Sequence, residues 1–362
     1  MRLGVDAGRA LHGRGGVASY TRELIRSLMG SSRVDEVILF DLDRGCSRRN
    51  TFVREFGPLP AKAVVAPPIR SELAGLNLFH APGYAMPPVG APRHVFTLHD
   101  LTVLSHPHCH TLDNRVRSLT SVTEALVRGS TILAVSKATR EEAARLLDLP
   151  FESVEVVPPM LNPVFQMAGD RDADAAAAAR LCVRQPYVLA VASLEPRKNF
   201  GRLLDAWSSL GGTAGAHQLV VVAAEGWRQG RIRRRLERMT GDGSVVKIGH
   251  ISEDVLAALY RRANAFVFPS LAEGFGLPVA EAMACGTPVV TSRISSMPEV
   301  AGDAALLVDP EDADEIAAAI ARMLEDRDLR RKLRDRGLEQ ARIFFPEALL
   351  PRLFEVYRRA AL

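Results

Sequence analysis

The sequence lacks any long hydrophobic run. No window of its 362 residues approaches the roughly 20 consecutive apolar residues that span a bilayer. The first residues, Met1 to Asp6, read directly into a strand and have no cleavage site of the signal-peptide type. Cysteine is scarce, and its four residues are far apart and form no C-x-x-C pair: Cys46, Cys109, Cys182 and Cys285. These absences favour a reduced, cytoplasmic protein.

The sequence also lacks the marks of a nucleic-acid module, namely zinc-ligand spacing, a recognition-helix signature and interleaved aromatic and basic residues. The formal net charge is only +4, yet positive charge is dense between Arg228 and Arg238. One interpretation of this run is a solvated helix face. The other is a patch that contacts a phosphorylated acceptor or anionic lipid, as a peripheral protein at the inner face of the membrane would.

Metal ligands are likewise missing from any suitable arrangement. His106, His108, Cys109 and His110 crowd into five residues and cannot easily converge on one ion, and established zinc spacings differ. No D-x-D pair stands where it could hold a cation beside a phosphate. We therefore predict no metal site.

What the chain does contain is a repeated alternation of short apolar runs and amphipathic stretches. The expected strands are Leu3–Asp6, Val37–Phe40, Leu78–His80, His94–Leu98, Ile132–Val135, Val154–Val157, Tyr187–Ala192, Gln218–Ala223, Val245–Ile248, Ala265–Phe268, Pro288–Thr291 and Ala305–Val308. The expected helices are Val17–Met29, Asn114–Val127, Lys137–Leu147, Phe200–Leu210, Gly230–Met239, Glu253–Arg262, Pro278–Ala284, Ala313–Leu324 and Leu329–Ile343. This order predicts two Rossmann-like domains with parallel sheets and a cleft between them, in which ligands bind at the carboxyl ends of strands.

The alternation fails between Pro158 and Pro186. We predict an interdomain linker over 158–170, followed by a short surface helix in the alanine-rich run. The expected domains are therefore an N-terminal domain over 1–165 and a C-terminal domain over 185–344. The stretch 345–362 has the apolar spacing of one more amphipathic helix, with Pro346 in its first turn.

Two glutamates flank a strand-to-helix turn in the second half. Glu273 lies in a glycine-containing loop after an expected strand, and Glu281 lies about one turn into the helix that begins near Pro278. Backbone amides at this turn can face an anion, while the carboxylates can accept hydrogen bonds from paired hydroxyls of a sugar or ribose. The alternative is a loop carboxylate and a helical carboxylate that both face solvent.

The motif Glu273-x7-Glu281, with Gly-Phe-Gly-Leu-Pro between, resembles the signature of family 4 retaining glycosyltransferases, which have the GT-B fold. The resemblance covers essentially the whole chain and is strongest from Tyr187 to Pro310. It implies that Glu273 contacts hydroxyls of the donor sugar and that Glu281 contacts the ribose. It also implies that amides around Phe275, Gly276 and Leu277 hold the sugar and diphosphate, and that the last helix packs back on the N-terminal domain.

An adjacent pair of cations, Arg197 and Lys198, stands between an expected strand and the helix that begins at Phe200. Cations at a helix start oppose the helix dipole, so their presence favours an anion between them. Two merely exposed basic residues are the alternative. The resembled family has a matching pair that binds the donor diphosphate, which implies this role for Arg197 and Lys198.

The loop from Gly13 to Ala18 fits a loose G-x-G-x-x-A pattern, and Asp41 ends the next strand, so a nicotinamide-dependent enzyme is the rival interpretation. Several residues separate the first strand from Gly13, however, whereas a dinucleotide fingerprint needs a tight turn directly after the strand. In the resembled family a Gly-Gly loop at this place covers the donor phosphate, which implies Gly15 and Gly16.

The segments Leu78-Phe79-His80-Ala81-Pro82 and Thr97-Leu98-His99-Asp100-Leu101 resemble the mannosyltransferase-type branch of the family. There the histidine faces the donor sugar, so His99 is expected to bond a sugar hydroxyl or to support charge in the transition state. A satisfied structural histidine is the alternative. The branch implies GDP-mannose as donor, with UDP-sugars and dTDP-sugars left open.

The expected activity is hexosyl transfer with retention, without metal or cofactor, by front-face attack in which the leaving phosphate accepts the acceptor's proton. The acceptor is a saccharide, a lipid-linked saccharide or a small molecule, and no oligomeric state is predicted. Two further alternatives share the fold: a catalytically silent GT-B partner module and a retaining disaccharide phosphorylase.

Overall fold

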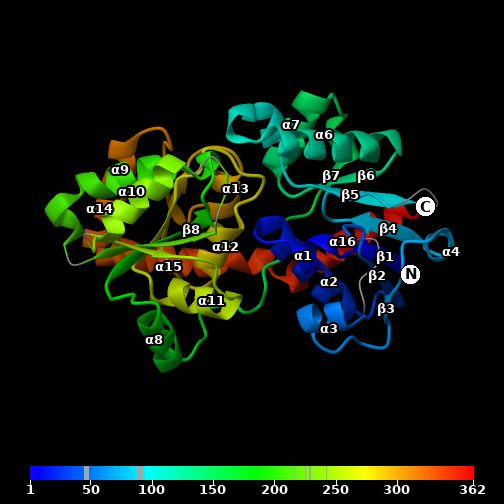
Figure 1. Cartoon of the computed structure of the whole chain (residues 1–362), viewed down its shortest axis with the longest axis horizontal. Coiled ribbons are helices and arrows are strands. Elements are labelled where there is room, and N and C mark those ends of the chain that lie inside the picture. Colours follow the sequence, from blue (N-terminus) through cyan, green and yellow to red (C-terminus); the bar gives the residue numbers. More distant parts are fainter. Residues whose placement is uncertain (45–48, 88–92, 216, 225, 228–229, 242) are drawn as a thin grey trace. The chain divides into compact units, whose positions relative to one another are not determined.

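The computed structural model, shown in Figure 1, describes residues 1–44, 49–87, 93–215, 217–224, 226–227, 230–241 and 243–362. The chain divides into two compact units, one formed by Met1–Met160 with Phe344–Leu362 and the other by Leu161–Ile343. Among the described residues, no helix combines the length and the hydrophobicity that crossing a bilayer requires. The expectations for Cys46 and Arg228 fall outside the described residues.

Seven parallel strands in the described part of the first unit form one sheet in the order β3-β2-β1-β4-β5-β6-β7. The strands are β1 (Arg2–Asp6), β2 (Glu36–Phe40), β3 (Ala63–Val65), β4 (Leu78–Ala81), β5 (His94–Leu98), β6 (Thr131–Ala134) and β7 (Val154–Val156). The helices are α1 (Gly8–His12), α2 (Gly16–Gly30), α3 (Arg49–Phe56), α4 (Arg70–Ala74), α5 (Thr102–Ser105), α6 (Leu112–Val127), α7 (Lys137–Leu147) and α16 (Pro346–Ala360).

Six parallel strands in the described part of the second unit form a sheet in the order β10-β9-β8-β11-β12-β13. The strands are β8 (Tyr187–Ser193), β9 (Gln218–Ala224), β10 (Val245–Ile248), β11 (Ala265–Phe268), β12 (Val289–Ser292) and β13 (Ala305–Val308). The helices are α8 (Arg171–Arg180), α9 (Phe200–Ser209), α10 (Gly230–Gly241), α11 (Glu253–Arg262), α12 (Leu277–Ala284), α13 (Met297–Ala301), α14 (Ala313–Glu325) and α15 (Arg327–Ala341). A 3-10 turn, η3 (Pro196–Lys198), precedes α9.

The predicted fold of two Rossmann-like α/β domains is confirmed. Every expected strand and helix is present within one or two residues of its expected ends, and the alanine-rich run forms α8. Ser136 caps α7 by accepting a hydrogen bond from the amide of Thr139 at 2.9 Å, as its position before the helix favours. The prediction missed short elements such as β3, which has three residues, and α1, whose N-cap makes no side-chain bond.

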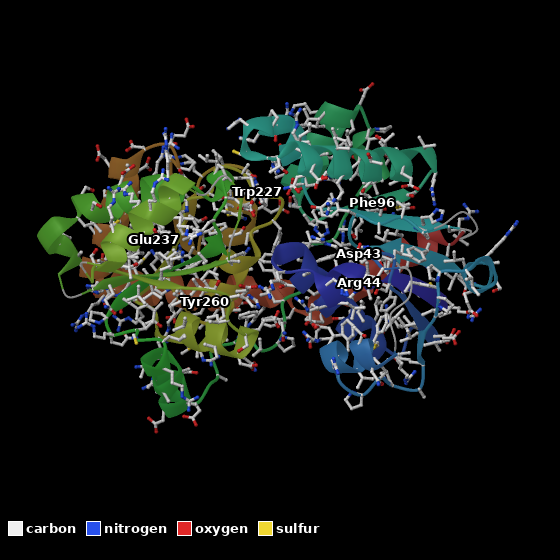
Figure 2. All side chains as sticks on the ribbon, in the orientation of Figure 1. Asp43, Arg44, Phe96, Trp227, Glu237 and Tyr260 are labelled. Atoms are coloured by element: carbon white, nitrogen blue, oxygen red, sulfur yellow. The ribbon has the colours of Figure 1, made fainter. Side chains whose placement is uncertain are left out.

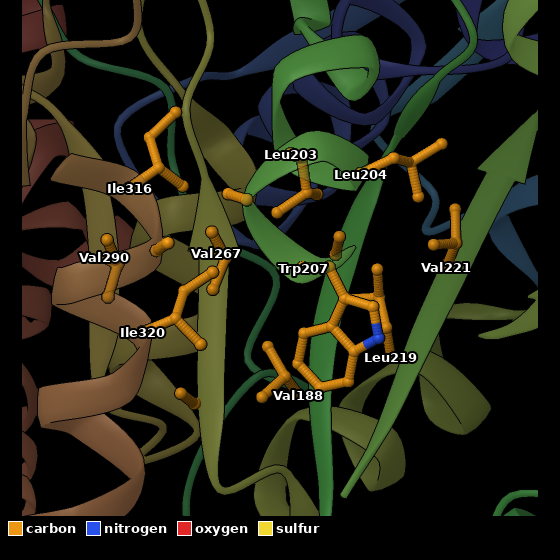
Figure 3. Close-up of a cluster of buried hydrophobic side chains, with 14 of the residues drawn as sticks. Val188, Leu203, Leu204, Trp207, Leu219, Val221, Val267, Val290, Ile316 and Ile320 are labelled. Carbon is orange, nitrogen blue, oxygen red and sulfur yellow. The ribbon is translucent and has the colours of Figure 1, made fainter. Parts of the chain in front are cut away.

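Both faces of each sheet are buried, which explains the continuous apolar runs of the strands. In the second unit, Trp207 of α9 lies over Val188 and Leu219 of the sheet (Figure 3). In the first unit, the C-terminal helix α16 adds apolar side chains to the cluster formed by β1, β2 and α2, namely Leu349, Leu353, Phe354, Val356 and Tyr357. In Figure 1, α16 is the red helix among the blue and cyan elements of that unit.

The segment expected as a linker, 158–170, is packed rather than free. Met160 belongs to the buried core of the first unit. Phe165 is buried in the second unit, and its ring lies edge-on to Tyr260 (labelled in Figure 2), with 6.1 Å between centroids. The division between the units therefore lies between Met160 and Leu161, because apolar side chains on either side of it are held by different cores.

Candidate functional site

The loops that follow β8 and β11 lie together at one edge of the second sheet. The chain runs from β8 outward to β9 and β10, then returns to place β11 on the other side of β8. Ala265 and Phe266 of β11 pair in parallel with Val188 and Leu189 of β8. A parallel sheet whose strand order reverses in this way opens a crevice at the carboxyl ends of the two strands, where ligands bind in such folds.

Hydrogen bonds to backbone carbonyl groups hold these two loops together. The amide of Leu271 donates to the carbonyl oxygen of Arg197 at 2.8 Å, and the Ser270 hydroxyl oxygen lies 3.0 Å from the same oxygen. Asn199 adopts a left-handed backbone conformation with φ of 60°, and its side-chain amide donates to the carbonyl oxygens of Pro269 and Pro310 at 2.9 and 2.6 Å. The turn that carries Arg197 and Lys198 is therefore anchored to the loop that carries Glu273.

Arg197, Lys198 and Glu273 form one ion-paired cluster. Nη1 of Arg197 donates to Oε2 of Glu273 at 2.8 Å, and Nζ of Lys198 donates to Oε1 at 2.6 Å. The three side chains are only 10%, 13% and 8% exposed, respectively. Burial opposes ionisation of Glu273, but the charges of Arg197 and Lys198 and hydrogen bonds from Lys198 and Ser270 outweigh it, so the pKa of Glu273 is lowered.

The pattern of the sequence did not reveal this pairing, nor the serines that support the loop. Ser270 donates to Oε1 of Glu273 at 2.6 Å. The Glu273 amide donates to the Ser295 hydroxyl at 3.0 Å, and that hydroxyl returns a hydrogen bond to the Glu273 carbonyl at 2.6 Å. A short serine-rich loop after a buried strand was the available signal for Ser295.

The N-terminus of α12 stands directly after this loop. Gly276 is the N-cap residue with φ of 105°, a conformation that L side chains rarely adopt, and a Cβ there would lie 2.3 Å from Cε of Met297. Pro278 has no N–H, and the Val279 amide donates to the Gly276 carbonyl at 2.9 Å, so in the first helical turn the Leu277 amide is the group that can face an anion or a sugar oxygen. Phe275 is buried, and its carbonyl accepts from the Ser296 hydroxyl at 2.8 Å.

Glu281 lies further along α12 and is 8% exposed. Its Oε2 accepts a hydrogen bond from the Tyr260 hydroxyl at 3.2 Å. Burial, and after it the charge of Glu253, raise the pKa of Glu281 to about 8. The side chain is thus a carboxyl group whose ionisation is sensitive to whatever enters its surroundings.

His99 belongs to the first unit, at the end of β5. Its Nε2 lies 2.7 Å from the carbonyl oxygen of Pro82, which can only accept, so Nε2 carries the proton. Burial lowers the pKa of His99 despite the opposing influence of that carbonyl and of Asp100. A neutral ring with Nε2 protonated leaves Nδ1 as an acceptor, which suits a sugar hydroxyl better than it suits a developing negative charge.

Gly15 and Gly16 begin α2 in the same unit. Gly15 is the N-cap residue with φ of 80°, and a Cβ there would meet no atom within 4 Å. Helix α1 separates β1 from these glycines, which disfavours the dinucleotide fingerprint. Tyr20 of α2 places its ring edge-on to the ring of His99, with 5.0 Å between centroids, so α2 connects the glycine loop to His99.

In the histidine-rich segment, His110 is held within the first unit. Thr102 donates to Oδ1 of Asp100 at 2.6 Å, and its hydroxyl oxygen lies 2.9 Å from Nε2 of buried His110. Among the described residues, no group of three or more His, Cys, Asp or Glu side chains could hold a metal ion.

The basic run forms the outer face of α10. Arg233 is ion-paired with Glu237 (labelled in Figure 2) at 3.0 Å, and Arg235 donates to Asp205 at 2.5 Å, while Arg231 and Arg234 are exposed. Part of this charge is therefore neutralised within the protein.

The fold and the site together define a glycosyltransferase of the GT-B type. The family described as glycosyl transferases group 1 matches residues 176–340. O-antigen chain mannosyltransferase B of Escherichia coli is 34% identical over 283 residues, which cover 78% of this chain and 74% of that protein. This chain accordingly belongs to the glycosyl transferases group 1 family and is a hexosyltransferase, as the resemblance implied.

Other relatives agree with this placement. The serotype-specific mannosyltransferase WbdA of Escherichia coli is 32% identical over 222 residues, which cover 60% of this chain but only 27% of the length of WbdA. Among solved structures, HepE of Anabaena in complex with UDP-glucose has a TM-score of 0.76 at 17% identity and covers 99% of this chain and all (100%) of that one. The glycosyltransferase WaaG has a TM-score of 0.73 at 14% identity and covers 98% and 99% of the two chains.

Proposed function

We propose that the protein transfers mannose from GDP-mannose to a hydroxyl group of a saccharide acceptor, with retention of configuration and without a metal ion or other cofactor. The observation that carries the proposal is the cluster in which Arg197 and Lys198 share the carboxylate of Glu273 beside the N-terminus of α12. The mannosyltransferase names of the relatives support the sugar. The complexes of HepE with UDP and UDP-glucose support a nucleoside diphosphate, although with another base.

Each residue has a role in this proposal. Arg197 and Lys198 bind the diphosphate, Glu273 accepts hydrogen bonds from sugar hydroxyls, and Glu281 accepts from the ribose. The remaining groups are the amides of Phe275, Gly276 and Leu277 for sugar and phosphate, Nδ1 of His99 for a sugar hydroxyl, and the loop of Gly15 and Gly16 for phosphate. Donor binding then requires Glu273 to exchange its bonds with the two cations for bonds with the sugar.

Catalysis follows from charge that grows on the leaving diphosphate. Arg197, Lys198 and the amides at the start of α12 are fixed before reaction, so they stabilise this charge without the reorganisation that water would need. Retention then follows from attack on the same face that the diphosphate leaves, with a phosphate oxygen taking the proton of the acceptor hydroxyl. The C–O bond to phosphate breaks as the C–O bond to the acceptor forms.

We extend the proposal to the location of the acceptor. The relatives include O-antigen chain mannosyltransferases of Escherichia coli and Salmonella typhimurium. A lipid-linked saccharide at the inner face of the membrane, approached from the cytoplasm, would fit a peripheral contact through the exposed arginines of α10. A small-molecule acceptor is the alternative outcome.

A panel of nucleotides tests the donor. In a thermal-shift experiment with GDP, UDP, ADP and dTDP, only the correct nucleotide should stabilise strongly, because a ligand that binds the folded state alone raises the melting temperature by mass action. We expect GDP to give the largest shift and GDP-mannose to be turned over to an α-mannoside, assigned by NMR. Stabilisation by UDP instead of GDP would overturn the assignment of the donor. A β-mannoside product would show that the reaction does not retain configuration.

A further inference from the structure

Glu195 is a buried carboxylate at the carboxyl end of β8, and the proposed function assigns it no role. Its side chain is 8% exposed. Its Oε1 accepts a hydrogen bond from the Ser193 hydroxyl. Its Oε2 is buried without a hydrogen-bond partner among the described residues and lies 3.6 Å from Nη2 of Arg197. An unsatisfied buried oxygen on a charged group is costly, so its position calls for a physical explanation.

The local backbone holds Glu195 in this place. A Cβ on Gly226, in the segment after β9, would lie 2.2 Å from the carbonyl oxygen of Leu194 and 3.2 Å from Cγ of Glu195. Only a glycine therefore permits this close approach to the 194–195 backbone. The Lys198 amide donates to the carbonyl oxygen of Glu195 at 3.1 Å, which ties the backbone of Glu195 to the turn that carries Arg197 and Lys198.

Arg197 consequently lies between two carboxylates. Its Nη1 is 2.8 Å from Glu273, and its Nη2 is 3.6 Å from Glu195. Among the described residues, the two cations of this cluster are matched by two carboxylates. A buried unit charge acts strongly over a few ångströms, because little water screens it. Glu195 therefore opposes the binding of an anion at Arg197.

We propose that Glu195 is a permanent counter-ion of Arg197 and thereby limits the affinity of the site for the nucleoside diphosphate product. This inference rests on the proposed binding of the diphosphate by Arg197 and Lys198. While a donor sugar engages Glu273, Arg197 keeps Glu195 as its partner. After the sugar has been transferred, Glu273 returns to both cations, and the two carboxylates together compete with the product and favour its release.

The variant Glu195→Gln tests the proposal, because it preserves the shape of the side chain and removes its charge. The dissociation constant of GDP, measured by calorimetry, should fall by about threefold or more, and the constant for product inhibition should fall with it. The affinity for GMP, which lacks the second phosphate, should rise by a smaller factor. Most substitutions in a binding site weaken ligand binding. If the role of Glu195 were merely structural, its substitution would not be expected to tighten GDP binding.

Glu311→Gln is the matched control. Glu311 is 72% exposed and pairs with Arg202 at 4.0 Å, so this variant loses the same charge at the surface and should leave the GDP constant unchanged. Should Glu195→Gln fail to fold, Glu195→Asp replaces it. This variant withdraws the charge from Arg197 by one methylene group and should tighten GDP binding by a smaller factor. Unchanged or weaker GDP binding in the folded variant overturns the proposal.

Lys198→Ala separates failure of this inference from failure of the proposed function. If Lys198→Ala leaves GDP affinity unchanged, the diphosphate does not bind at this cluster and both proposals fail. If Lys198→Ala weakens GDP binding while Glu195→Gln does not tighten it, only the role proposed for Glu195 is wrong. UDP replaces GDP in every measurement should the nucleotide panel select it.

Discussion

Oη of Tyr357 lies 2.5 Å from Nδ1 of His80, a hydrogen bond between residues 277 positions apart. His80 continues the chain of bonds through its Nε2, which is 2.7 Å from the Thr97 hydroxyl, and that hydroxyl is 3.0 Å from the hydroxyl of Tyr20. Burial, and after it the unfavourable coulombic interaction that the protonated ring would have with a protonated His99, lower the pKa of His80 to about 3, so the ring is neutral. The C-terminal helix is thereby bonded to the strand ends beside His99.

We predict that Tyr357→Phe lowers the free energy of unfolding by about 1–3 kcal/mol, because it leaves a buried polar atom of His80 without its partner. Denaturant titration measures the change. Arg358→Ala on the exposed face of α16 is the control and should cost less than about 0.5 kcal/mol. Equal stability of the two variants would show that the buried bond contributes nothing.

Deletion of 345–362 should expose apolar surface on the first unit, because Leu349, Leu353 and Phe354 cover part of its core. We expect a truncated protein that binds a hydrophobic dye or aggregates, although the deletion removes none of the proposed binding residues. A well-folded truncation with full transferase activity is the result that contradicts this prediction.

We predict that Lys198→Ala lowers turnover by about 10²–10³, the range found when one group that stabilises developing charge is removed. The loss should be larger in kcat than in the affinity for the nucleoside, because charge grows on the diphosphate only as it departs. Steady-state kinetics and calorimetry with GDP and GMP separate these effects. Arg331→Ala, at a position of α15 whose side chain is 71% exposed, is the control. Intact turnover with equal loss of GMP and GDP binding would refute the assignment.

The affinity for nucleotide should rise with pH up to about 8 and then level off, because Glu281 accepts ribose hydrogen bonds best as a carboxylate and its pKa is raised to about 8. The same shift makes the native state bind more protons than the unfolded chain. Its contribution to stability is therefore present at low pH and is lost as the pH rises from about 4.5, the unperturbed value, through about 8.

Calorimetry between pH 6 and 9 measures this dependence. Glu281→Ala should weaken nucleotide binding by roughly 1.5–3 kcal/mol, the contribution of a hydrogen bond to a charged group, and should flatten the pH profile. An unchanged dissociation constant in the variant would remove Glu281 from the ribose role.

Activity should persist in excess EDTA, because Arg197, Lys198 and the amides at the start of α12 supply the positive charge that the diphosphate needs. Initial rates with and without chelator measure this. Loss of turnover that manganese or magnesium restores would show that the proposed metal-free mechanism is wrong.

The local sequence by itself determined most of the elements. Buried strands such as 188–191 and 219–222 are continuous apolar runs, and amphipathic spacing with a capping residue marks helices such as α7. The motif around Glu273 and Glu281 was sufficient to indicate the family. Short pieces such as α1 and β3 escaped prediction because three to five residues carry too little periodicity and no cap.

The tertiary structure alone decided which charges meet. Lys198 and Glu273 are 75 positions apart, and they pair because the reversal of strand order makes β8 and β11 neighbours. The same reversal brings Glu273 to Arg197, and the return of α16 to the first sheet brings Tyr357 to His80. Local propensity acts over a few residues, whereas these contacts depend on the order of strands and on which faces are buried, so no sequence window contains them.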